Sequence, residues 1–161
     1  MSNIDRTTLT EILLTTLAEA THGPADPKFT WFNSNEPDSG ITGVMKTLSA
    51  EQASREPTPG GRTIAAHVAH ATFHLVASAA WLSGDRSAAD WDASWSPATV
   101  DEAGWQRLRE SLEAAHRAVA DAIRRKEHWD RTDLGGAMGA VAHAAYHLGA
   151  IRQFMRMMGN G

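Results

Sequence analysis

The stretch AVAHAAYHLGAIRQF, residues 140–154, decides the fold of this chain. Its apolar residues recur in steps of three and four, as they do along the buried face of an α-helix. His143 and His147 are one helical turn apart, so their rings point about 40° apart on that same face. The pattern predicts a buried helix that begins between Leu134 and Met138 and runs to Met158, with both histidines directed into the core.

Three other segments show helical spacing of apolar residues, at 5–21, 63–82 and 99–126. The last of them opens on Thr99-x-x-Glu102, the spacing of a capping box. A short helix at 41–48 and a turn after Ser49-x-x-Gln52 are also expected. Since no segment alternates apolar and polar residues as a half-buried strand does, the sequence predicts an all-α bundle. The length of 161 residues predicts one domain over 1–161.

The composition excludes several classes of protein. A net charge of −4, with arginines scattered along the chain, argues against a nucleic-acid partner, because such proteins normally carry a basic face. No run approaches the roughly 20 apolar residues that span a bilayer, and the first residues lack a secretory signal, so no membrane partner and a cytoplasmic location are expected. There is no cysteine, so any metal must be held by nitrogen and oxygen.

The positions of the eight histidines are the strongest chemical signal. His67, His70 and His74 have offsets of three and seven, which place all three on one side of the second long helix. One of them could complete a three-nitrogen metal site with His143 and His147. Three protein ligands with open positions are typical of a catalytic metal, although buried structural histidines give the same pattern.

Two details narrow this interpretation. A zinc protease of the H-E-x-x-H type is excluded, because Ala144 follows His143 where the glutamate would be. The other three histidines, His22, His116 and His128, are interpreted as structural.

Two segments together resemble the DinB-like family: GRTIAAHVAH at 61–70 and HAAYHLGAIRQ at 143–153. The resemblance implies a four-helix bundle with long crossover connections, often a homodimer. It also implies that His67, His143 and His147 bind a divalent metal. His70 and His74 are then expected next to the ligands or in the pocket, with His70 as an alternative ligand. Arg152 either reaches an anionic substrate or pairs with an acid on the surface.

Similar proteins of this architecture are metal-dependent thiol transferases and isomerases, so the resemblance implies transfer of a low-molecular-weight thiol to an electrophile. Bacillithiol, mycothiol and glutathione are the candidate thiols. Three imidazoles suit zinc or nickel, and also iron or copper. Two alternatives stay open: a metal-dependent hydrolase, and a non-catalytic metal-binding bundle associated with stress. The sequence identifies no catalytic side chain of the protein itself.

Overall fold

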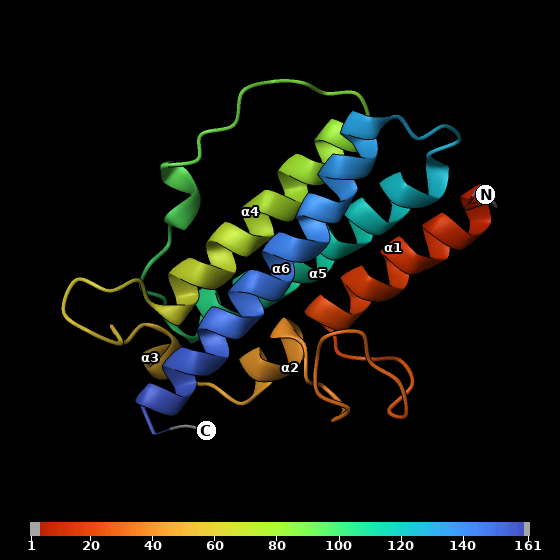
Figure 1. Cartoon of the computed structure of the whole chain (residues 1–161). Coiled ribbons are helices and arrows are strands. Elements are labelled where there is room, and N and C mark those ends of the chain that lie inside the picture. The colour runs from red at the N-terminus through yellow and green to blue at the C-terminus, as the bar shows by residue number, and fades with distance from the viewer. Residues whose placement is uncertain (1–3, 160–161) are drawn as a thin grey trace.

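The computed structural model describes residues 4–159, and all regular elements in that range are helical (Figure 1). They are α1 (Arg6–Thr21), α2 (Ile41–Lys46), α3 (Ala50–Ala53), α4 (Ile64–Leu82), the 3₁₀-helix η1 (Ala93–Trp95), α5 (Glu102–Arg125) and α6 (Arg131–Met157). None of these helices is long and apolar enough to cross a membrane.

The four long helices α1, α4, α5 and α6 lie side by side as a bundle (Figure 1). α4 packs against both α5 and α6, and α1 packs against the same two helices from the other side. Long connections join α1 to α4, where they contain α2 and α3, and α4 to α5, where they contain η1. The predicted all-α bundle with long crossovers is therefore confirmed.

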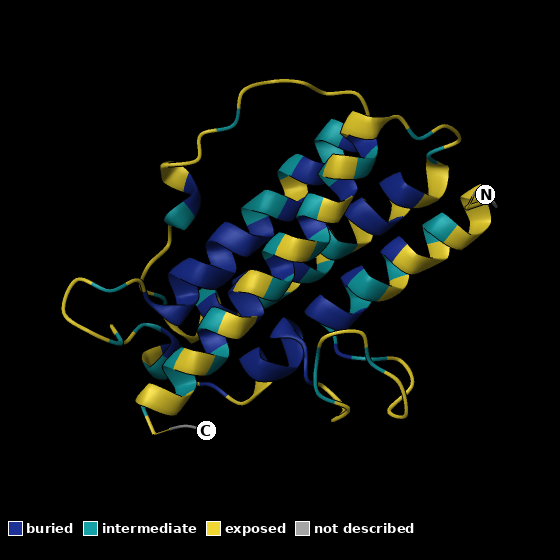
Figure 2. Ribbon diagram, in the orientation of Figure 1, coloured by how far each residue is buried: buried dark blue, intermediate teal, exposed yellow. Residues whose placement is uncertain are grey.

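The core runs along the inner faces of these helices (Figure 2). Six positions of α5 that recur in steps of three and four are all buried: Trp105, Leu108, Leu112, Ala115, Val119 and Ala122. Trp105 also donates its indole N–H to the carbonyl of Leu48 over 3.0 Å, which ties the end of the α2 connection to α5. The hydrophobic periodicity of this helix thus predicts its buried face.

The predicted capping box at the start of α5 is wrong. Asp101 is the N-cap, and its carboxylate accepts the backbone N–H of Gly104 over 2.6 Å. Glu102 instead accepts the backbone N–H of Ala50 over 2.9 Å, so it caps α3 across the bundle. An acidic residue next to the first helical residue satisfies the local donors, which frees Glu102 for this long-range contact.

α6 begins at Arg131, earlier than the sequence predicts, with Asp130 as its N-cap. In the structure Gly136 lies against Trp81, and a Cβ there would come within 3.2 Å of the indole ring. The glycine therefore allows close packing of α6 on the end of α4. The additional helical turns bring the start of α6 beside the last turns of α4.

A buried carboxylate holds the connection between α1 and α2. Glu19 is 2% exposed and accepts the backbone N–H groups of Trp31, Phe32 and Asn33 as well as the hydroxyl of Thr30. Burial alone would raise the pKa of Glu19, but these hydrogen bonds outweigh it and lower the pKa. The loop is thereby fixed to the bundle although several of its aromatic side chains are exposed.

Candidate metal centre

Five histidines meet at the contact between α4 and α6, and we call them the histidine cluster: His67, His70, His74, His143 and His147. The first three lie on the side of α4 that faces α6, as their helical spacing predicts. Alanines occupy many positions between them, and these small side chains leave room for the rings between the helices.

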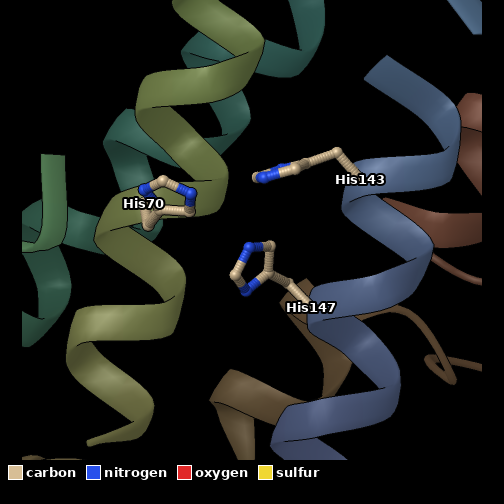
Figure 3. Close-up of side chains that lie close together, drawn as sticks. All are labelled: His70, His143 and His147. Carbon is tan, nitrogen blue, oxygen red and sulfur yellow. The ribbon is translucent and has the colours of Figure 1, made fainter. Parts of the chain in front are cut away.

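Three members of the cluster form a group with metal-ligand geometry. His70, His143 and His147 each offer a ring nitrogen, and these nitrogens all lie within 4.8 Å of one another. Figure 3 shows the three rings around one shared space, with His70 on α4 opposite the two histidines of α6. The spacing of four residues on α6 thus directs both rings to the same point, as the sequence predicts.

The surroundings keep these rings uncharged. Burial, with a smaller contribution from neighbouring histidines, lowers the pKa of His143 to about 4 and that of His147 to about 3. Burial also lowers the pKa of His70, with a contribution from the guanidinium of Arg62. A neutral imidazole carries the free lone pair that a metal ligand needs. At neutral pH the group is therefore ready to bind a cation without first losing protons.

Two nitrogens of the group have unmet hydrogen-bonding capacity. Nδ1 of His143 and Nε2 of His147 are buried and have no hydrogen-bond partner among the described residues. Such atoms are rare in folded proteins, and an ion or an ordered water usually accounts for them. The donor set therefore fits a bound cation.

Ser94 of η1 fixes the ring of His70. Its Oγ lies 2.6 Å from Nδ1 of His70, while its own proton is donated to the carbonyl of Trp91. Oγ can therefore act only as the acceptor, and His70 carries its proton on Nδ1. This leaves the lone pair of His70 on Nε2. A ligating histidine typically donates its other N–H in this way.

Aromatic stacking fixes the same ring from one face. Trp95 lies parallel to His70, with ring centroids 3.8 Å apart and an interplanar angle of 6°. The guanidinium of Arg62 lies 3.8 Å from the centroid of the Trp95 ring. The crossover between α4 and α5 thus supplies both a hydrogen bond and a stacking surface to the cluster.

His67 lies beside the group of three histidines. Its Nδ1 lies 2.9 Å from Nδ1 of His147, so one of these rings donates to the other. It is buried, and burial lowers its pKa to about 4. The group of three nitrogens contains His70 in its place. His67 contacts the group through His147, and its role as the third ligand stays a prediction.

The two remaining predicted site residues lie outside the group. His74 stacks on His143, with ring centroids 3.8 Å apart and an interplanar angle of 12°, and it lines a neighbouring cavity. Arg152 donates one N–H to Oδ1 of Asn33 over 2.7 Å and another to the carbonyl of Ser39. Arg152 thus helps to hold the connection between α1 and α2, and its partners there are neutral oxygens.

Sequence reasoning missed the contribution of the crossover. Trp95 stacks on His70, and Trp91 approaches His74 with ring centroids 5.7 Å apart. Nothing in the sequence distinguishes Ser94 from other loop serines. The two tryptophans that flank Ser94, Trp91 and Trp95, are the feature of the sequence that could have indicated a contact between this segment and the histidine cluster.

Comparison with known proteins agrees with this architecture. A family model described as the DinB superfamily matches residues 40–151. The match covers more than half of the chain and contains α4, α5, η1 and all five histidines of the cluster. No curated protein and no solved structure gives a significant match. On the strength of the helical fold and this match, the chain belongs to the DinB superfamily.

Proposed function

We propose that this protein is a divalent-metal-dependent enzyme that transfers a low-molecular-weight thiol to an electrophile. The observation that carries the proposal is the pair of buried nitrogens on His143 and His147 without a hydrogen-bond partner, beside a third ring that Ser94 orients. A structural role alone would leave these nitrogens unsatisfied at a cost of about 1–3 kcal/mol each.

The ligands in this proposal are His70, His143 and His147. Nε2 of His70 is free because its Nδ1 proton goes to Ser94. When His147 donates from Nδ1 to His67, its buried Nε2 keeps a lone pair for the ion. His67 then orients His147 as Ser94 orients His70. The family motif implies His67 as the third ligand instead, and the metal content of the two single variants distinguishes these assignments.

The chain's own residues hold and prepare the site. Burial keeps the imidazoles neutral, and the Trp95 stack keeps water away from one face of His70. What an ion supplies there when bound is a lower pKa for a thiol, so that the thiol reacts as a thiolate at neutral pH. Because the chain has no cysteine, the nucleophile must come from a separate thiol molecule.

The donor set limits the metal without naming it. Three imidazoles suit zinc or nickel, and iron or copper can occupy the same site. We propose zinc or nickel as the resident ion. The predicted homodimer stays a prediction that light scattering of the purified protein can test.

The first experiment measures metal content. Protein purified without a histidine tag or chelator should hold close to one divalent ion per chain, and His143→Ala should hold almost none. If the wild-type protein is empty and also refuses added zinc and nickel, the histidines are structural and the proposal fails.

The second experiment tests the reaction. Metal-loaded protein is incubated with glutathione, mycothiol or bacillithiol and 1-chloro-2,4-dinitrobenzene. In this reaction an aryl C–S bond forms, the C–Cl bond breaks, chloride leaves with the bonding electrons and the thiol proton goes to the buffer. Activity should follow metal content. Metal binding without conjugation would favour a non-catalytic metal-binding bundle, and metal-dependent cleavage of ester substrates would favour a hydrolase.

A further inference from the structure

A cavity of about 710 Å³ lies beside the histidine cluster. It is bounded by the second half of α4, the first turns of α6 and the crossover between α4 and α5. Its volume falls in the range of roughly 300–1,000 Å³ that is typical of small-molecule sites. The first turns of α6, which begins at Arg131, supply part of its wall through Thr132, Gly136 and Gly139.

The cavity adjoins the proposed metal site through one side chain. His74 lines the cavity and stacks on His143, with 3.8 Å between the ring centroids. Trp91 also lines it and lies near both His74 and His70, with ring centroids 5.7 and 6.3 Å apart. A molecule in the cavity would therefore be separated from the histidine group by about the thickness of one ring.

The chemistry of the lining is aromatic. Phe73, Trp81 and Trp91 contribute three aromatic side chains, and Phe73 holds Trp91 edge-on with ring centroids 5.3 Å apart. Between them the helices present small residues such as Ala77 and Gly139, which take up little of the space. Aromatic side chains in the lining favour a planar, apolar ligand that can stack on them.

The charged groups in the lining are already compensated. Arg86 lies over the ring of Trp81, donates to the Trp81 carbonyl and bonds to Asp133 over 3.2 Å. Asp85 accepts both the backbone N–H and the hydroxyl of Ser87, which lower its pKa and keep it anionic. Arg86 is the only arginine or lysine among the lining residues. An anionic ligand would therefore find no free cation.

We propose that this cavity binds a neutral, planar aromatic molecule and holds it beside the histidine group. The identification of that molecule as the electrophile rests on the proposed function, whereas the cavity and its preference for a neutral aromatic do not. The nearest face of the ligand would then contact His74 and Trp91.

A substitution at Gly139 would fill part of the cavity without displacing a neighbouring side chain. It lines the cavity, and a Cβ added there meets nothing within 4 Å, so Gly139→Leu would place its side chain in open space. Gly149 is the matched control, since it lies on the same helix, is exposed, and also has open space at its Cβ. Leucine is a better helix former than glycine, so neither variant should unfold the protein.

The experiment uses the fluorescence of two related probes, the neutral N-phenyl-1-naphthylamine and its anionic analogue 1-anilinonaphthalene-8-sulfonate. We expect saturable binding of the neutral probe to the wild type and to Gly149→Leu, and binding about ten-fold weaker or worse to Gly139→Leu. Equal binding to Gly139→Leu, or tighter binding of the anionic probe than of the neutral one, would overturn the proposal.

Two further readouts separate this proposal from the thiol-transfer function. If probe binding is lost in Gly139→Leu while no thiol conjugation is found in any sample, the cavity proposal stands and the proposed reaction fails. If conjugation occurs and Gly139→Leu leaves it unchanged, the reaction stands and the identification of the cavity's ligand as the electrophile is overturned. A change in molar mass by light scattering in Gly139→Leu alone would show that a second copy of the chain covers this surface, which also overturns it.

Discussion

Two helix pairs in this bundle bring histidines together, and the hydrogen bonds of the rings differ between the two places. Between α1 and α5, His22 and His116 lie with ring centroids 4.3 Å apart, and burial lowers the pKa of His116 to about 4. Thr21 Oγ1 lies 2.8 Å from Nδ1 of His116, and Glu113 lies 3.0 Å from Nε2 of His22. In the cluster between α4 and α6, two buried nitrogens have no such partner among the described residues.

The comparison shows which property points to an ion. Close contact between histidines and a lowered pKa occur in both places, so neither identifies a metal site. The difference lies in the hydrogen bonds, because a hydroxyl and a carboxylate satisfy the His22–His116 pair. Unsatisfied buried nitrogens on neighbouring rings are therefore the stronger indication.

The largest expected effect is a loss of bound metal from a variant in one region and not from a variant in the other. His143→Ala should lose nearly all bound metal, a drop greater than the ~10–100-fold that follows the loss of a residue that only hydrogen-bonds to a ligand. His116→Ala should keep close to one ion per chain, because its partners are Thr21 and other protein groups. Elemental analysis of both purified variants measures this. Loss of metal in His116→Ala with an intact fold would contradict the distinction between the two regions.

The second-largest effect tests which histidines of the cluster bind the metal. His70→Ala should lose metal as completely as His143→Ala, whereas His67→Ala should retain it with affinity lower by ~10–100-fold, as expected for a residue that acts through His147. Titration calorimetry with zinc on both variants measures the two affinities. The reverse order would show that His67 is the ligand, as the family motif implies.

The fold could be predicted from the sequence because its helices are long and strongly periodic. The steps of three and four in α5 and α6 locate their buried faces, and the His143–His147 spacing locates one half of the site. Helix ends were less predictable, since Asp101 replaced the capping box expected at Thr99 and the start of α6 lies before Gly135. Both errors arise where tertiary contacts, to Ala50 and Trp81, decide the local structure.

The rest of the site depends on the path of the crossover. Whether His67 or His70 faces the pair on α6 differs by less than one helical turn, which periodicity alone cannot resolve. Ser94 contacts His70 from a segment whose Trp91 packs on Phe73 and whose Trp95 stacks on His70. Such contacts join segments that are distant in sequence, so no local pattern encodes them.

A smaller effect tests the role of that crossover. Ser94→Ala removes the acceptor that holds the Nδ1 proton of His70, so zinc affinity should fall by ~10–100-fold. Ser78→Ala is the matched control, since its hydroxyl lies 3.3 Å from Nδ1 of His74, which is outside the group. Zinc titration gives the affinities, and ¹⁵N NMR of metal-free protein should show a changed His70 tautomer in Ser94→Ala alone. Equal affinities in the two variants would count against an orienting role for Ser94.

The smallest effect concerns a property that both regions share. Burial lowers the pKa of six histidines in the fold: His67, His70, His74, His116, His143 and His147. Below the ordinary value of 6.5 the unfolded chain binds protons that the folded protein does not, so the stability of metal-free protein should fall as the pH falls from 6.5 towards 4. Urea unfolding at several pH values measures the slope.

Replacement of one ring in either region should then have the same consequence for that slope. His116→Gln and His143→Gln should each reduce the proton uptake on unfolding by up to about one proton, because each removes one buried imidazole. Only His143→Gln should also lose metal. If the two variants differed in the slope measured without metal, the surroundings of the two rings would differ in more than their hydrogen bonds. If they agree, burial explains the titration of both regions, and the unsatisfied nitrogens alone separate a metal centre from a pair of packed rings.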